Sequence, residues 1–219
     1  MPARIFLAGA SGVVGRRLSR LLIADRHHVV GTTRSADKGA VLAKLGLEPV
    51  VVDVFDAPAL RRAVVAARPD VVIHQLTDLP PALHPTEMPA ALVRTARIRD
   101  EGTRNLIAAS GAAGVRRMVV QSIAFSIDEA LLAFEQQVMD APLTGLVLRY
   151  GQFYGPDTGF DVPAPSPPTV HVDAAADAAR RAITRGSGGV YVVADAAKTP
   201  SSDRATRELG WDADFRIAP

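Results

Sequence analysis

The chain has 219 residues, 48% of them hydrophobic, which is enough for one substantial domain with a buried sheet. Its formal net charge of +2 and the scattering of its arginines do not indicate nucleic-acid binding, and the absence of cysteine excludes disulfides and thiolate metal sites. No leader pattern and no apolar run of membrane-spanning length is visible, so we expect a cytoplasmic protein with no membrane partner and no metal site.

The first part of the chain predicts a strand, a glycine turn, a helix and a second strand. The regular elements expected are a strand over Arg4–Ala8, a helix over Val13–Ala24 and a strand over His28–Thr33. Gly9 permits the tight turn, Gly12 lets the main chain approach a pyrophosphate, and Gly15 lets the helix pack on the strand. A strand before the glycines and a helix after them are the context that a dinucleotide-binding turn requires. A glycine-rich turn without a ligand is the alternative.

The segment Gly9–Gly15, which reads GASGVVG and is followed by RRL, resembles the extended and atypical short-chain dehydrogenase/reductase superfamily, with its NAD-dependent epimerases and dehydratases. The resemblance implies a Rossmann fold that binds NAD or NADP. The cofactor contacts that it implies in this segment are made by Gly9, Ser11, Gly12, Val13, Val14 and Gly15.

The end of the second strand favours NADP over NAD. An acidic residue at this place binds the ribose 2′-hydroxyl of NAD, whereas a nearby arginine accommodates the 2′-phosphate of NADP. Arg34 stands here, and no acid follows the strand before Asp37. Arg34 is therefore expected to bind the 2′-phosphate, and an ordinary solvated arginine is the alternative.

The next segments continue the alternation of helices and strands that is typical of a doubly wound sheet. Helices are expected over Lys38–Leu45 and Ala57–Ala67, and strands over Glu48–Asp53 and Asp70–Gln75. The resemblance implies that Asp53 and Val54 contact the adenine, although an aspartate that simply opens a loop is equally compatible. Leu76 and Thr77 lie at the carboxyl edge, where the nicotinamide ribose would pass. His74 is expected to pack in the core without a catalytic role.

The middle of the chain predicts a loop, a long helix and a strand that ends on a serine. The loop covers Asp78–Pro89, the helix Ala90–Ser110 and the strand Val115–Gln121. Asn105, within a GTRNL segment that resembles the superfamily, is expected to be structural. A serine at the end of this strand hydrogen-bonds the reacting oxygen of the substrate in the resembling superfamily. Ser122 is therefore the expected catalytic residue.

The superfamily transfers hydride with a YxxxK pair, in which the tyrosine moves a proton and the lysine lowers the pKa of that tyrosine. No tyrosine or lysine occurs between Ser122 and Arg149. If Glu135, in the helix expected over Ile127–Val138, corresponds to the glutamate that often follows the lysine by four residues in the superfamily, the tyrosine and lysine places fall on Ile127 and Leu131. A tyrosine with a pKa of about 10 is a poor acid–base group at neutral pH without a nearby cation. The proton donors left to consider are Ser122, Asp128, Tyr150 and Tyr154.

The last part of the chain contains a second segment that resembles the superfamily, LRYGQFYGP, after a strand expected over Leu143–Tyr150. The resemblance implies that Tyr150 and Gly151 lie beside the nicotinamide and that Gln152 faces the substrate. The remaining expectations are a flap over Asp157–Thr169, a helix over Ala174–Arg185 capped by Asp173, a strand over Gly189–Val193 and a helix over Ser201–Leu209.

Together these segments predict an α/β, Rossmann-type, doubly wound parallel sheet: a single domain over residues 1–219, with a reduced substrate-binding portion over about 151–219. The first functional hypothesis is an NADP-dependent oxidoreductase, epimerase or dehydratase that acts on a small carbonyl or hydroxy compound through a non-standard acid–base group. The alternative is a non-catalytic NADP-binding sensor or interaction protein. In the resembling superfamily, dimers often form through the helices that correspond to residues 90–110 and 127–140. The exposed faces expected for these helices contain Leu92, Val93, Leu131, Leu132 and Val138, which permit a homodimer but do not require one.

Overall fold

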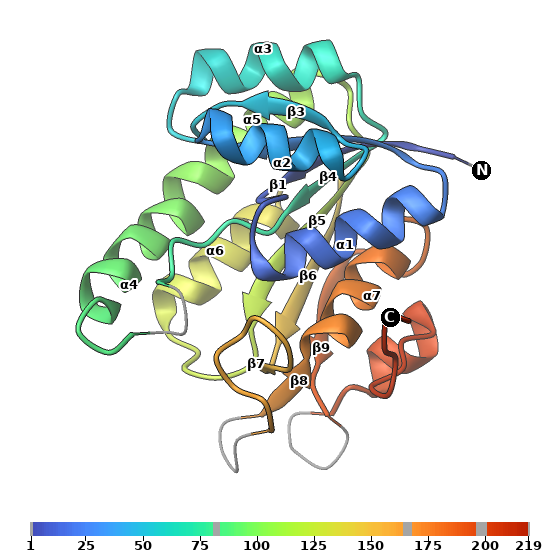
Figure 1. The fold of residues 1–219 in the computed structure, drawn as a ribbon. Coiled ribbons are helices and arrows are strands. Elements are labelled where there is room, and N and C mark those ends of the chain that lie inside the picture. The colour runs from blue at the N-terminus through green and yellow to red at the C-terminus, as the bar shows by residue number, and fades with distance from the viewer. Residues whose placement is uncertain (1, 81–83, 164–167, 196–200, 219) are drawn as a thin grey trace.

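A seven-stranded parallel sheet forms the centre of the molecule (Figure 1). The computed structural model describes residues 2–80, 84–163, 168–195 and 201–218. In spatial order the strands are β3 (Glu48–Val51), β2 (His28–Thr33), β1 (Arg4–Ala8), β4 (Val71–His74), β5 (Arg117–Ile123), β6 (Thr144–Tyr150) and β9 (Gly189–Val193). The order reverses between β1 and β4, which makes the sheet doubly wound and opens a crevice at its carboxyl edge. The predicted Rossmann-type architecture is confirmed.

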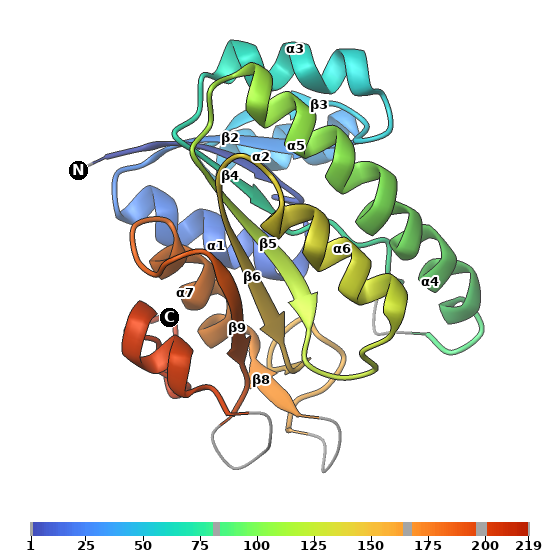
Figure 2. The ribbon, with the colours of Figure 1, turned by 180° about the vertical axis from the view of Figure 1, so that it is seen from behind.

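Helices cover both faces of the sheet, as the two views in Figures 1 and 2 show. One face carries α1 (Val13–Ala24), α2 (Ala36–Lys44) and α7 (Val172–Ala182), and the other carries α3 (Ala57–Ala67), α5 (Thr103–Ala112) and α6 (Glu129–Met139). Strand β1 supplies both cores, because Ile5 and Leu7 point to the first face while Phe6 and Ala8 point to the second. This explains why its sequence is apolar throughout instead of alternating.

Several helices begin where the sequence provides a capping side chain. Asp56 accepts a hydrogen bond from the backbone N–H of Ala59 at 3.0 Å, and Asp128 accepts one from Leu131 at 2.8 Å. Ser35 caps α2 in the same way, so this helix begins at Ala36, earlier than the predicted Lys38. The first helix differs, because Gly12 at its N-cap has no side chain to bond the free N–H groups.

The long helix predicted over Ala90–Ser110 is interrupted. Helix α4 (Met88–Arg97) is followed by a π-helical turn, η2 (Ile98–Gly102), and then by α5. The turn packs tightly on the loop after β3, since a Cβ atom at Gly102 would lie 3.1 Å from a Val54 methyl carbon. A π-turn inside a helix shifts the side chains around the axis and frequently marks a functional site.

The C-terminal part contains a small sheet that was not predicted. Strands β7 (Gln152–Tyr154) and β8 (Thr169–His171) pair in parallel beside the carboxyl end of β6. The expected cap of α7 was wrong, because the side chain of His171, not of Asp173, accepts from the helix, at the Asp173 N–H. Asp173 instead pairs with Arg17 at 2.9 Å and so ties α7 to α1. Residues 164–167 of the flap expected over Asp157–Thr169 lie outside the described ranges. The last helix, expected over Ser201–Leu209, contains a π-helical turn, η3 (Ala205–Leu209).

The apolar residues expected on a dimer face divide into two groups. Leu131 and Val138 are buried in the core, so their assignment to an exposed face was wrong. Leu92, Val93 and Leu132 are exposed, and the homodimer stays a prediction. Within the described ranges, every helix is too short or too polar to cross a membrane.

Candidate active site

A cavity of about 680 Å³ lies at the carboxyl edge of the sheet, across the point where the strand order reverses. Its wall contains residues from the ends of β1, β2, β4, β5 and β6 and from the turn η2. This volume lies within the range of small-molecule and cofactor sites, about 300 to 1,000 Å³. The position is the one at which open α/β sheets bind their ligands.

The glycine turn has the geometry that the sequence predicted. Gly9 has a φ of +93°, and a Cβ atom on it would lie 2.7 Å from the Gln75 carbonyl oxygen. A Cβ atom on Gly15 would lie only 2.1 Å from the Gly9 carbonyl oxygen, so close packing of α1 on the turn excludes any side chain there. Gly12 stands at the cavity wall and donates its N–H to Gly9 at 3.1 Å.

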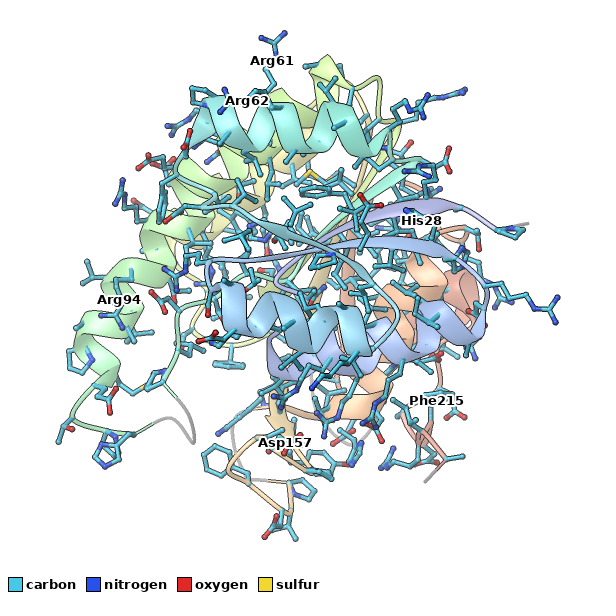
Figure 3. All side chains as sticks on the ribbon, turned by 45° about the horizontal axis from the view of Figure 1, so that its top comes forward. His28, Arg61, Arg62, Arg94, Asp157 and Phe215 are labelled. Atoms are coloured by element: carbon cyan, nitrogen blue, oxygen red, sulfur yellow. The ribbon has the colours of Figure 1, made fainter. Side chains whose placement is uncertain are left out.

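The N-terminus of α1 opens on this cavity. Ser11, Val13 and Val14 belong to its wall, and the first turn of the helix contains no acidic residue. Free N–H groups and the positive end of the helix dipole therefore face the cavity, which suits a pyrophosphate. Asp157, after β7, approaches from the other side and accepts from Arg16 and Arg17 at 3.3 Å each (Figure 3).

The end of the cavity near β2 is basic. Arg34 and Lys38 belong to its wall, together with Thr33 and Ser35, and no acid stands at the end of β2. The Arg34 guanidinium, whose side chain is 56% exposed, pairs with Asp78 at 3.2 Å.

Two residues expected near the adenine, Asp53 and Val54, also belong to the cavity wall. One carboxylate oxygen of Asp53 accepts from the Phe55 N–H at 2.9 Å, so Asp53 shapes its loop as well as facing the cavity. The main-chain carbonyl of Val54 accepts from the Asn105 side chain at 3.0 Å. Asn105 thus has the structural role that was predicted for it.

The opposite end of the cavity is formed by the ends of β4, β5 and β6. Leu76, Thr77, Tyr150, Gly151 and Gln152 lie in its wall, where the sequence placed the nicotinamide and the substrate. The Tyr150 hydroxyl and both polar atoms of the neighbouring Gln75 amide are buried and make no hydrogen bond with described residues. Burial raises the pKa of Tyr150, and the Gln75 amide beside it lowers that pKa by less.

Ser122 does not face the cavity, contrary to the catalytic role expected for it. Strand β5 extends to Ile123, and alternation of its side chains turns Gln121 and Ile123 toward the cavity and Ser122 toward α6. The fully buried Ser122 hydroxyl donates to a Glu135 carboxylate oxygen at 2.6 Å. Arg149 donates to the same oxygen at 2.8 Å, so this cluster joins β5, α6 and β6.

The other candidate proton donors are also used elsewhere. Ile127, at the tyrosine place, is exposed, and Leu131, at the lysine place, is part of the core. Asp128 caps α6, and Tyr154 packs edge-on against His171 with ring centroids 5.2 Å apart. Among the described residues at the β4–β6 end of the cavity, none is a free carboxylic acid, a lysine or an accessible tyrosine.

His74 belongs to the core, as predicted. Its Nδ1 accepts from the Leu76 N–H at 3.1 Å, so the ring proton is on Nε2, which donates to the Thr103 hydroxyl at 3.1 Å. Burial, with a smaller effect of the Arg99 charge, lowers the pKa of His74 to about 4.

The residues of the cavity wall that sequence reasoning missed include Arg99, Gln121, Ile123 and Phe125. The period of two along β5 was the available indication for Gln121 and Ile123. Arg99 could not be found in this way, because the π-turn that directs it to the cavity is not visible as a pattern.

A Rossmann-type sheet, a glycine turn in which Gly9 and Gly15 admit no side chain, and a cavity over the strand-order reversal define a dinucleotide-binding protein. The sequence model of a family described as NAD(P)H-binding matches residues 9–146, more than half of the chain. The chain belongs to this family.

The chain is similar to 3-diazoavenalumate denitrifying reductase from a Streptomyces species, with 40% identity over 183 residues, which cover 72% of this chain and 58% of that protein. It therefore spans less than two thirds of the length of this relative. Among solved structures, UDP-glucose 4-epimerase from Thermotoga maritima with UDP-glucose has a TM-score of 0.74 at 17% identity, covering 97% of this chain and 94% of the other. Yeast methylglyoxal/isovaleraldehyde reductase Gre2 with NADPH has a TM-score of 0.65 at 16% identity, covering 87% and 75%. These likenesses establish the common fold.

Proposed function

We propose that the chain is an NADP-dependent reductase whose substrate accepts hydride without needing a proton, and that this substrate carries an aryl diazonium group. The observation that carries the proposal is the absence of a proton donor among the described residues at the β4–β6 end of the cavity. The Tyr–Lys pair is missing, Ser122 is bonded to Glu135, and the Tyr150 hydroxyl is buried with a raised pKa.

The cofactor fits the residues present. Ser11, Gly12 and the first turn of α1 would hold the pyrophosphate, and Gln75 and Tyr150 would flank the nicotinamide. The unpartnered Gln75 amide has a donor and an acceptor for a ligand amide, which would relieve the cost of burying both groups unpaired. Arg34 and Lys38, with no acid at the end of β2, support NADP over NAD.

The lack of a proton donor among the described residues favours a reduction that needs only hydride over one that also needs a proton. Reduction of a carbonyl by hydride leaves an alkoxide that must take up a proton, which is the task of the absent tyrosine. With an aryl diazonium ion, the bound dinucleotide would supply hydride to the ring carbon while the C–N electron pair leaves with dinitrogen, so that Ar–N₂⁺ and NADPH become Ar–H, N₂ and NADP⁺. The relative named a diazo-compound denitrifying reductase supports this reaction class.

The test is to incubate the protein with a carboxylated benzenediazonium ion and NADPH carrying deuterium at one face of C4. A catalysed reaction releases one N₂ per NADPH and transfers deuterium from one face only, whereas the uncatalysed reaction does not distinguish the faces. The Gly12→Val variant is the matched control, since its isopropyl group would obstruct the phosphate path, while the Cβ atom itself meets only the Gly9 oxygen, at 3.3 Å.

Two results would overturn the proposal. NADPH-dependent reduction of aldehydes or ketones without turnover of the diazonium ion would assign a carbonyl substrate. Tight NADPH binding with no turnover of either class would favour the sensor or interaction protein.

A further inference from the structure

Arg99 is a cation in the cavity wall that no other described residue binds through a hydrogen bond or an ion pair. It lies in the π-turn η2 and is half-buried. The neighbouring arginines differ, because Arg97 pairs with Glu101 at 2.7 Å and Arg104 pairs with Asp100. The guanidinium donors of Arg99 are therefore available to an anionic ligand in the cavity.

The turn η2, which carries Arg99, packs against α6, the helix that follows β5, so Arg99 lies toward the β4–β6 end of the cavity. The charge of Arg99 contributes to the lowered pKa of His74, at the end of β4. Burial lowers the pKa of Arg99 itself, and the carboxylates of Asp128 and Glu135, near β5 and α6, partly offset this effect. Arg34 follows β2, three strands away from β5 in the sheet, or about 14 Å at the usual spacing. Arg99 is therefore separated from the basic end that suits the 2′-phosphate.

The charge around Arg99 suits a singly charged anion better than a phosphate. One guanidinium binds a carboxylate through two parallel hydrogen bonds, and the nearby Asp128 and Glu135 would repel a second negative charge. The same cavity wall contains Ile123, Phe125 and Phe153, which suit a flat apolar body beside the charged group.

We propose that Arg99 binds the carboxylate of an aromatic or conjugated substrate and so orients its reacting carbon. This assignment rests on the proposed function in taking the cavity as a substrate site, and it adds the anionic group that the substrate carries. Arg99 then selects substrates that carry a negative charge.

The assignment is tested by equilibrium binding, without turnover. Calorimetric titration of the NADP⁺-saturated protein compares cinnamate with cinnamamide, which is uncharged but of nearly the same shape. The native chain is expected to bind cinnamate about tenfold or more tightly than cinnamamide. Arg99→Met is expected to remove this preference and Arg99→Lys to keep part of it. Arg104→Met, on an exposed arginine outside the cavity wall, is the matched control and retains the full preference.

Four outcomes overturn the assignment: equal binding of the two ligands, binding of neither, a cinnamate preference that survives in Arg99→Met, or a loss of NADP⁺ affinity in that variant as large as its loss of cinnamate affinity. If Arg99→Met does not fold, the assignment is still tested by comparing cinnamate with cinnamamide binding in the native chain and in the Arg99→Lys variant. Since no diazonium ion is present, a failed denitrification assay with an intact cinnamate preference refutes the proposed function alone.

Discussion

Replacing Arg34 by alanine tests which dinucleotide the cavity prefers. A hydrogen bond from a charged group to a phosphate is worth about 1.5–3 kcal/mol. The Arg34 side chain is 56% exposed, and binding a phosphate would break its ion pair with Asp78, which is worth less than about 1 kcal/mol. A net loss of about 1–2 kcal/mol remains, or a ~5- to 30-fold weaker binding of NADPH. NADH lacks the 2′-phosphate, and its affinity is expected to change by less than about twofold.

Fluorescence titration of the reduced nicotinamide measures both dissociation constants. Arg94→Ala is the matched control, because Arg94 is the second partner of Asp78, at 3.0 Å, and does not belong to the cavity wall (Figure 3). This control is expected to leave the NADPH affinity as it is. Equal weakening of NADPH and NADH in Arg34→Ala, or no weakening of either, would refute the assignment of Arg34 to the 2′-phosphate.

Three further predictions concern the turn, the serine and the histidine. Gly15→Ala places a carbon 2.1 Å from the Gly9 oxygen, so urea unfolding should show a loss of about 3 kcal/mol or more together with weaker NADPH binding; an unchanged midpoint would contradict the packing. Ser122→Ala removes one of the hydrogen bonds to Glu135 and should lower stability by about 1 kcal/mol while leaving any kcat/KM within about twofold, unlike a catalytic serine. The pKa of His74 is lowered to about 4 in the folded protein, so between pH 6.5 and 4 the unfolded chain binds more protons than the folded chain. The free energy of unfolding should therefore decrease by about 3 kcal/mol in all as the pH is lowered through this range, and His74→Asn should reduce this dependence.

The nucleotide half of the site could be predicted from sequence because backbone geometry determines it. The bounds of β1, α1 and β2 agree with those predicted, and the sterically required Gly9 and Gly15 stand at the predicted turn. A residue without a side chain leaves a clear pattern in a sequence, since no other residue satisfies the same constraint.

The substrate half could not be predicted in the same way. The period of two along β5 groups Gln121 with Ile123 and separates both from Ser122, but it does not reveal which of the two groups faces the cavity, and Ser122 was assigned to the wrong side. The π-turn that directs Arg99 inward depends on packing of Gly102 against Val54, which joins residues 48 positions apart. Strands β7 and β8 have three residues each, which is too short for a periodic pattern, and they pair across a long connection.

The two halves of the site therefore differ in what they retain from the superfamily that the sequence resembles. The turn of Gly9 and Gly15 and the cavity over the strand-order reversal keep what is needed to hold a nucleotide. Leu131 packs in the core at the place expected for the lysine, and no tyrosine or lysine occurs between Ser122 and Arg149. A site that keeps hydride delivery without proton delivery suits a substrate whose leaving group takes away the electron pair, and dinitrogen is such a group. In the proposed reaction Arg99, which pairs with no other described residue, would orient that substrate in place of a catalytic tyrosine.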